Sequence, residues 1–220
     1  MARTAVFDII GTCFSFTPIR QRLAEMGAPD LVLDLWFAQT LRDAFALSHS
    51  GGYVQLKDVF AAELPRTLRS AGVSSDAAQR ERLVRMLGEM PPQPGLVEAT
   101  TRLREGGWKL LALTQGAIET TRKLLDLAGA GESFDDVLSA DSVRKTKPHP
   151  DVYRLALGAA DGEDWMIAAH AWDIAGAARA GMRTVFVAVD EDEYLTGVYP
   201  PADLVAGSLP EVAQRLLELS

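Results

Sequence analysis

The chain has 220 residues, enough for one large domain or for a core with a smaller lobe. Its apolar fraction of 48% and charged fraction of 24% are those of an ordinary globular protein. The net charge of -8 argues against nucleic acid or an anionic membrane surface as a partner, because both need a basic face, but it leaves room for a small anionic substrate.

The first predicted element is a strand over residues 4–10. Asp8 interrupts its apolar run, so the run is too short for a signal peptide. Cys13 follows as the single cysteine, which excludes an internal disulfide and favours a cytoplasmic location. No segment approaches the ~20 apolar residues of a membrane span, so no membrane partner is expected.

A helical zone comes next. Residues 31–47 are predicted to form a helix, because apolar side chains recur at steps of three and four and make one stripe. This stripe consists of Leu31, Leu35, Ala38, Leu41 and Phe45. Further helices are predicted over residues 56–68 and 76–87, with Ser74 and Ser75 as a start for the second. The sequence PPQPG at 91–95 then marks a boundary between lobes.

After this boundary, helices and apolar strands alternate. The predicted helices cover 96–105, 117–127, 150–159 and 174–180, and the predicted strands cover 108–113, 137–139, 165–169 and 184–189. This pattern indicates an α/β fold with a doubly wound parallel sheet, covered on both faces. We expect residues 1–14 and 93–220 to form the core domain and residues 15–92 to form a helical cap inserted after the first strand.

Polar side chains follow four of the predicted strands, at the edge where an open parallel sheet binds its ligands. These residues are Asp8 with Thr12, Thr114 with Gln115, Lys145 with Lys147, and His170 with Asp173. An acid, a hydroxyl, a lysine and a second acid on successive strand ends are much rarer by chance than one acid alone. The sequence therefore predicts a catalytic or binding site at this edge.

Each residue also has a structural alternative. Asp8 could form a turn or cap a helix, and Thr114 and Asp173 could cap the helices that follow them. Lys147 could be a solvated loop residue, and His170 could be a structural histidine. Cys13 is expected to be a small buried side chain. The functional interpretation depends on the whole set.

The motifs FDIIGT, LTQG, KTKPHPDVY and AHAWDIAGAARAG, in this order, resemble those of the haloacid dehalogenase superfamily. The resemblance covers essentially the whole chain, and the nearest pattern is that of the L-2-haloacid dehalogenase branch. It implies a sheet core of the Rossmann type with a helical cap, and it also implies a homodimer.

The resemblance also implies roles. Asp8 would be a nucleophile that forms an ester with substrate, and Thr12 would orient it. Lys147 would neutralise and position Asp8, and Asp173 would help to activate the hydrolytic water. Thr114 would hold a substrate oxygen, and Tyr153 matches a tyrosine of the dehalogenase pocket. The chemistry agrees with these roles, since a carboxylate is a weak nucleophile that must be desolvated and aimed.

Ile10 indicates which leaving group the site can expel. Phosphatases of the superfamily carry a second Asp two residues after the nucleophile, and this acid protonates the departing alkoxide. Ile10 cannot donate a proton, and a phosphatase without that acid would lose about 10²–10⁴-fold in rate. Halide needs no proton to leave, so Ile10 favours displacement at carbon, with no cofactor and no metal.

Several positions depart from the family pattern. Phe37 stands where dehalogenases carry an arginine that contacts the halide. Arg42 is five residues further on and so faces another side of the helix, which leaves Arg20 as the other candidate in the cap. Gln115 replaces the usual Asn, His170 stands where Asn is common, and Ala168 lies where Ser is frequent.

The sequence thus predicts a hydrolase that displaces halide from a short 2-haloalkanoic acid through an ester on Asp8. In the first alternative, the protein is a hydrolase of another substrate, which includes a phosphatase that tolerates Ile10 and binds Mg²⁺ at Asp8 and Asp173. In the second alternative, it is a catalytically silent protein that binds small acids. In all three cases the partner is a small molecule.

Overall fold

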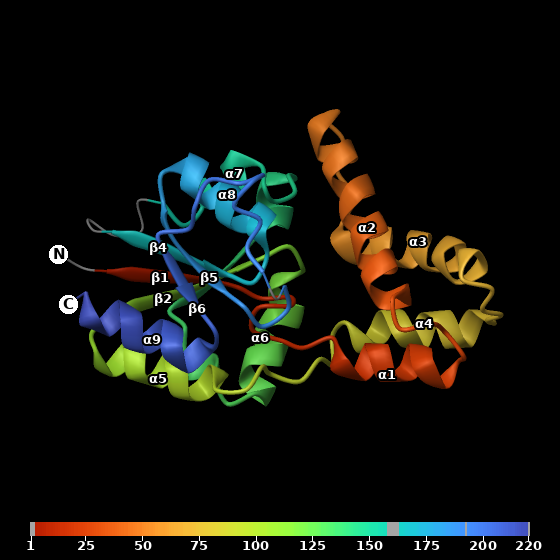
Figure 1. Ribbon diagram of the computed structural model, residues 1–220, viewed down its shortest axis with the longest axis horizontal. Helices are drawn as coiled ribbons and strands as arrows, with labels where there is room; N and C mark the ends of the chain where they lie inside the picture. Colours follow the sequence, from red (N-terminus) through yellow and green to blue (C-terminus); the bar gives the residue numbers. More distant parts are fainter. Residues whose placement is uncertain (1–2, 158–162, 192, 220) are drawn as a thin grey trace. The chain divides into compact units, whose positions relative to one another are not determined.

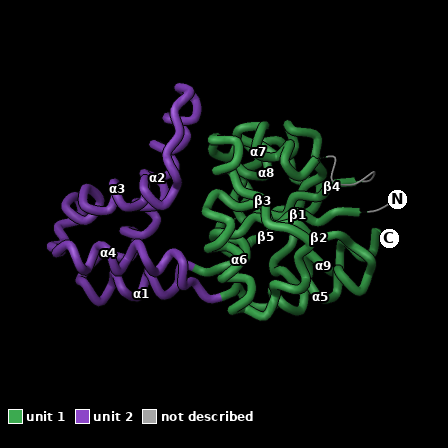
Figure 2. Tube along the Cα trace, turned by 180° about the vertical axis from the view of Figure 1, so that it is seen from behind, with its two compact units in different colours: residues 1–15, 92–220 green, residues 16–91 purple. Residues whose placement is uncertain are grey.

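The computed structural model describes residues 3–157, 163–191 and 193–219. The chain divides into two compact units, Met1–Ser15 with Pro92–Ser220 and Phe16–Pro91, which Figure 2 shows in green and purple. We call the first the core unit and the second the cap unit. Within the described residues, no helix combines the length and the apolar character that crossing a bilayer requires.

The core unit is built on a six-stranded parallel sheet with the strand order β3-β2-β1-β4-β5-β6. Its strands are β1 Thr4–Asp8, β2 Lys109–Thr114, β3 Asp136–Ser139, β4 Asp164–Ala168, β5 Arg183–Val187 and β6 Leu204–Ala206. All five residues of β1 are buried, as expected for a parallel strand covered on both faces. The predicted α/β fold with a parallel sheet is confirmed.

Helices cover both faces of this sheet. They are α5 Leu96–Glu105, α6 Ile118–Leu127, α7 Pro150–Arg154, α8 Ala171–Ala180 and α9 Leu209–Glu218, with short 3-10 helices at Gly131–Ser133 and Ala140–Val143. In Figure 1, α7 and α8 lie on one face, and α5 and α9 lie on the other. On the α8 face, Val6, Met166 and Phe186 from three strands pack with Ile174 of the helix.

The strand order brings the candidate residues of β1, β2 and β4 to one edge of the sheet. Chain connections run from β1 outward to β2 and β3, then return to β4 on the other side of β1. The reversal creates a switch point at the carboxyl end of β1, which is where open sheets of this type bind ligands. Asp8 pairs in register with Leu113, and Phe7 with Ile167, so the ends of β1, β2 and β4 share one edge.

The cap unit contains four helices, α1 Thr17–Glu25, α2 Val32–His49, α3 Leu56–Ser70 and α4 Ala77–Met86. Its interior is built around Trp36, whose ring meets that of Phe60 edge-on and whose Nε1 donates to the Phe60 carbonyl at 2.9 Å. Helix α4 begins with a capping box between Asp76 and Gln79, so the helix start lies at Asp76 and not at the two serines before it.

Some sequence-based expectations were wrong. Of the predicted stripe on α2 only Leu41 is buried, while Leu31 is 74% and Leu35 40% exposed. The buried face is turned by about one residue and includes Val32, Leu33 and Trp36, because the large indole directs the helix inward. Helix α7 ends at Arg154, and part of the predicted helix over 150–159 lies outside the described residues. The expectations did not include α1, β6 or α9.

Candidate functional site

Asp8 is the last residue of β1 and is 4% exposed. Its Oδ1 accepts a hydrogen bond from Lys147 Nζ at 3.0 Å, and its Oδ2 accepts one from Thr12 Oγ1 at 2.6 Å. Burial alone would raise the pKa of Asp8. The charge of Lys147, with the contacts of His170 and Thr12, outweighs burial and holds this pKa well below its usual range. Asp8 is therefore a desolvated but ionised carboxylate.

The turn after β1 holds Thr12 against Asp8. Gly11 has a φ of 86°, a left-handed conformation that suits glycine, and a Cβ here would lie 2.7 Å from His170 Cε1. The Thr12 hydroxyl, while donating to Asp8, accepts the backbone N–H of Ala169 at 2.9 Å. The hydroxyl thus ties the nucleophile candidate to the end of β4.

Lys147 lies in the loop before α7 and is fully buried. Its Nζ donates to Asp8 Oδ1 and, at 2.9 Å, to Asp173 Oδ2, while its backbone N–H donates to Gln115 Oε1 at 2.7 Å. Burial would lower the pKa of Lys147, but the two carboxylates raise it. The side chain is a permanent cation between two acids and not a solvated loop lysine.

Asp173 is on the first turn of α8 and fully buried. Besides Lys147 on Oδ2, its Oδ1 accepts the Tyr153 hydroxyl at 2.6 Å, so Asp173 does not cap the helix. Burial and the neighbouring charge of Asp8 raise the pKa of Asp173 against the opposing charge of Lys147. Gly176 allows the tyrosine to approach, because a Cβ there would lie 2.5 Å from its hydroxyl.

His170 is 1% exposed and lies between two carboxylates. Its Nδ1 is 3.4 Å from Asp8 Oδ2, and its Nε2 is 3.3 Å from Asp190 Oδ2. Burial would lower the pKa of His170, but the contacts with Asp190 and Asp8 raise it to about 10. The Trp172 ring stacks on the imidazole with 5.3 Å between centroids. His170 is therefore an imidazolium at neutral pH.

The remaining core candidates lie at the same edge. Thr114 Oγ1 accepts the N–H of Gly116 at 3.0 Å, which stabilises the turn after β2 and not the start of α6. Gln115 is 6% exposed, and its Nε2 has no hydrogen-bond partner among the described residues. Ile10 lies two residues beyond Asp8 and offers no proton. The Cys13 thiol donates to the Asp8 carbonyl at 3.0 Å, and burial raises its pKa well above the usual value, so it is no nucleophile.

Phe37 belongs to the cap unit. Its ring lies 5.3 Å from that of Phe16 and 6.1 Å from that of Phe60, measured between centroids. The two arginines considered as substitutes are engaged elsewhere on this unit. Arg20 pairs with Asp34 at 2.7 Å, and Arg42 pairs with Asp43 at 2.7 Å. Both pairs are exposed, so neither guanidinium is held ready for a buried anion.

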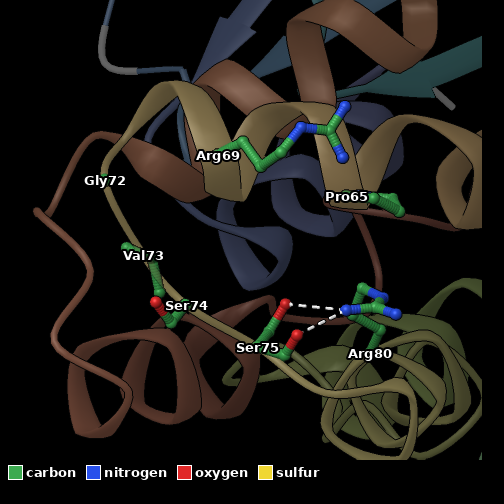
Figure 3. Close-up of a pocket in the computed structure, with 7 residues that line it drawn as sticks. All are labelled: Pro65, Arg69, Gly72, Val73, Ser74, Ser75 and Arg80. Atoms are coloured by element: carbon green, nitrogen blue, oxygen red, sulfur yellow. Dashed lines mark hydrogen bonds between the residues drawn. The ribbon is translucent and has the colours of Figure 1, made fainter.

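A separate hollow of about 620 Å³ lies on the cap unit, between the end of α3 and the start of α4 (Figure 3). Arg80 faces it and donates to the backbone carbonyl of Ser75 at 2.6 Å and to its hydroxyl at 3.1 Å. The residues that line the hollow include neither a carboxylate nor a histidine. We therefore assign the chemistry to the edge of the sheet in the core unit.

The acids of the site are a poor fit for Mg²⁺. Both oxygens of Asp8 and both oxygens of Asp173 already accept hydrogen bonds from protein donors. Lys147 already supplies positive charge to both carboxylates. Among residues 3–157, 163–191 and 193–219, no group of three or more His, Cys, Asp or Glu side chains could hold a metal ion.

The comparison with protein families decides the membership of this chain. Residues 2–181 match the family model of the haloacid dehalogenase-like hydrolases. The chain belongs to the haloacid dehalogenase-like hydrolases. The resemblance seen in the four motifs is thereby confirmed, and the protein is a hydrolase of this superfamily.

Individual proteins are also similar to this chain in sequence. The chain is 27% identical over 214 residues to an (S)-2-haloacid dehalogenase of Xanthobacter autotrophicus, which covers 95% of this chain and 82% of the relative. It is also 34% identical over 126 residues to the pyrophosphatase PpaX of Halalkalibacterium halodurans, but that match covers only 55% of this chain and 58% of the relative.

Solved structures share the fold. The L-2-haloacid dehalogenase of Xanthobacter autotrophicus with chloropropionic acid covalently bound superposes with a TM-score of 0.85 at 23% identity, over 100% of both chains. At this identity the likeness shows the fold. The relatives and the fold together confirm the resemblance to the L-2-haloacid dehalogenase branch.

Sequence reasoning missed two acids of this hydrolase. Asp190, which faces His170, and Glu191, whose Oε2 accepts the N–H of Ala171 at 3.0 Å, follow β5. The rule that found the other residues would have found these, because they directly follow the predicted strand over 184–189.

Because His170 is an imidazolium in the folded hydrolase, we expect the stability of the protein to depend on pH. The pKa of His170 rises from 6.5 to about 10 on folding, so its charge stabilises the folded state fully below pH 6.5. This contribution, of the order of a few kcal/mol, is lost as pH rises through 10. Thermal melting should show a fall in Tm from pH 7 to 10 that is much smaller in His170→Gln. His149→Gln, a change at a partly exposed histidine, should keep the wild-type fall.

Proposed function

We propose that this hydrolase is a 2-haloacid dehalogenase. Asp8 attacks C2 of a short 2-haloalkanoate from the side opposite the halogen and expels halide. Water then attacks the carbonyl of the resulting Asp8 ester and releases a 2-hydroxy acid. The observation that carries the proposal is the buried, ionised carboxylate of Asp8, held by Lys147 and Thr12 and followed by Ile10 in place of a proton donor.

Other residues complete the reaction. Lys147 keeps Asp8 ionised before attack. Asp173 holds Lys147 and helps to bind the water of the second step, and Tyr153 fixes Asp173. Thr114 and Gln115 lie at the end of β2, next to Asp8 in the sheet, where they would contact the substrate carboxylate and the leaving group.

The halide must be drawn off without the arginine of the family. Gln115 Nε2 is a buried donor with no partner among the described protein groups, and an amide N–H is a suitable donor for a halide. We assign this task to Gln115.

Ile10 separates this proposal from phosphatase chemistry. Halide is a good leaving group without protonation, whereas an alkoxide needs a general acid that Ile10 cannot provide. The ion pairs of Lys147 point the same way, because this cation already supplies positive charge to both Asp8 and Asp173 and would repel Mg²⁺.

The test measures two products in parallel. Racemic 2-chloropropionate should yield chloride and lactate at a rate that EDTA leaves unchanged, and p-nitrophenyl phosphate should yield no phosphate with or without Mg²⁺. Phosphate release that needs Mg²⁺ would overturn the proposal in favour of a phosphatase. If neither product forms and small carboxylates raise the Tm, the protein is a binder of small acids.

We further propose that the enzyme is a cytoplasmic homodimer. Leu31 and Leu35 present an exposed apolar side of α2, which is a suitable surface for a second copy. The buried single cysteine fits a reducing compartment. Light scattering in solution should give twice the mass of the chain, and a monomer mass would contradict the dimer.

A further inference from the structure

Three side chains from three parts of the core unit are connected by two contacts that end at the proposed nucleophile. Asp190, from the loop after β5, faces His170 Nε2 at 3.3 Å, and His170 Nδ1 faces Asp8 Oδ2 at 3.4 Å. The imidazole is packed against Gly11, where a Cβ would lie 2.9 Å from Nε2 and 3.3 Å from Asp190 Oδ2. The backbone of the turn is thus shaped around this histidine.

We propose that His170, oriented by Asp190, is the base that takes the proton from the water that hydrolyses the Asp8 ester. The inference rests on the proposed function and adds to it the residue that accepts this proton. His170 is then a catalytic residue, because it contacts the reacting carboxyl group, and Asp190 is a positioning residue.

Asp173 is less suited to the same task. Both of its oxygens are engaged, Oδ1 with the Tyr153 hydroxyl at 2.6 Å and Oδ2 with Lys147 Nζ at 2.9 Å. Protonation of Asp173 would neutralise one carboxylate partner of Lys147 within a buried ion pair, which is costly. His170 Nδ1 instead lies 3.4 Å from Oδ2 of the carboxyl group that becomes the ester, so it is next to the carbon that the water attacks.

The protonation state of His170 depends on whether Asp8 carries its negative charge. In the free enzyme, the imidazolium faces two carboxylates. When Asp8 bonds to carbon and halide leaves, the charge of Asp8 disappears, and His170 releases its Nδ1 proton to solvent. Asp190 keeps the N–H at Nε2 in place, so Nδ1 presents a lone pair toward the ester.

Hydrolysis then restores the starting state. The water oxygen bonds to the ester carbonyl carbon, and the bond between this carbon and the alkoxide oxygen breaks. Of the two water protons, one ends on the hydroxyl of the 2-hydroxy acid, and the other ends on His170 Nδ1. Asp8 is again a carboxylate and His170 again an imidazolium, so no other reactant is needed.

The surroundings of His170 support this change of protonation. The charged groups that face it or act on it are Asp8, Asp190 and Glu191, and Lys147 acts through Asp8. The contacts with Asp8 contribute to the high pKa of His170 in the free enzyme, and esterification removes the charge of Asp8. The pKa of His170 therefore falls when the base is needed, while Asp190 keeps it high enough to accept a proton.

The test separates the two chemical steps. Enzyme in excess over racemic 2-chloropropionate is quenched at short times, and chloride, lactate and the mass of the intact protein are measured. In His170→Gln, chloride should still be released in a single turnover, lactate should form about 10²–10⁴-fold more slowly, and an adduct should accumulate on Asp8. Asp190→Asn should show the same defect in weaker form.

A pH profile tests the role of Asp190. Hydrolysis of the ester should slow as pH falls, because His170 becomes protonated. Loss of Asp190 lowers the pKa of His170, so in Asp190→Asn this acid limb should move to lower pH. Glu193→Gln, which removes an exposed acid of the same loop, should leave the limb in place. A purely structural role of Asp190 would change Tm without moving the limb.

The outcomes are distinct. If the wild-type protein releases no chloride from any haloacid, the proposed function fails and this inference fails with it. If the wild type turns over, but His170→Gln forms lactate at the wild-type rate with no adduct, the inference alone is overturned. If the variants do not fold, the wild-type protein still tests the inference. Its adduct should accumulate as pH is lowered, and a pH-independent ratio of chloride burst to lactate would overturn the inference.

Discussion

Asp8→Asn is expected to lower the turnover of 2-chloropropionate by about 10⁶-fold, the size of effect seen when a covalent nucleophile is removed. A neutral amide cannot displace halide from carbon. No other side chain of the site can replace Asp8 as the nucleophile. The buried Cys13 thiol is protonated and bonded to the Asp8 carbonyl. The effect is measured by the chloride released in a single turnover and by mass spectrometry of the intact protein, which detects an adduct.

This variant should remain folded, which makes the result interpretable. Without the charge of Asp8, Lys147 still faces Asp173 and His170 still faces Asp190, so each buried cation keeps a carboxylate. The variant loses the stability that the lowered pKa of Asp8 adds at pH 7, so its Tm should lie below that of the matched variant Asp126→Asn, which changes an exposed acid on α6, but its unfolding should stay cooperative. Chloride release at the wild-type rate by folded Asp8→Asn would refute the assignment of the nucleophile.

Lys147→Met is expected to abolish activity and to destabilise the core unit by about 3–5 kcal/mol at pH 7, because two buried carboxylates lose their shared cation. Asp8 and Asp173 would then face each other across a site without Lys147, and their pKa values would rise. Urea unfolding at several pH values measures the loss of stability.

The pH dependence of this loss has a definite sign. In the wild type, the lowered pKa of Asp8 adds stability that is present above pH 4 and is lost as pH falls. In Lys147→Met, the carboxylates stay protonated to higher pH, so the deficit should shrink as pH is lowered. Lys145→Met, the same change two residues away at a partly exposed position, should cost less than about 0.5 kcal/mol. A deficit that is equal at pH 4 and pH 7 would contradict the electrostatic explanation.

Much of the core unit could be predicted from the sequence, because the signals were local. Strands that are apolar at nearly every position, such as residues 108–113, alternate with helices, and few folds other than a parallel sheet fit this alternation. Helix α5 was predicted with the bounds that the structure has, Leu96–Glu105, because glycines adjoin both of its ends. By contrast, the short strand β6 carries too few residues for a periodic signal.

The cap unit shows where local patterns fail. On α2 the spacing of Leu31, Leu35 and Leu41 predicts one face, but the helix buries the neighbouring face with Trp36. A stripe of leucines and a large aromatic compete, and the aromatic prevails because it buries more area and meets Phe60. Only tertiary packing decides between two such faces.

The candidate site was predictable as a set of strand-end residues, but not as a network. The sequence offered Lys147 as a cation for Asp8, and the structure adds its second bond to Asp173. The partner of His170 could not be deduced from its own motif, since Asp190 comes from the loop after another strand. Contacts between loops depend on the strand order, which places the ends of β1, β4 and β5 within reach of one another.

The path of the chain beside Asp8 has a consequence for how this protein could change over evolutionary time. Phe14 forms a bridge with Pro92, and the N–H of Gln93 donates to the Cys13 carbonyl at 2.8 Å, so the strands that leave and re-enter the core unit are fastened together. Residues 16–91 therefore leave the core unit and return to it at one place, where the two connecting segments are hydrogen-bonded to each other. Replacement of these residues by a longer, shorter or unrelated segment would leave the nucleophile and the sheet undisturbed, so new substrates can be acquired without rebuilding the chemistry.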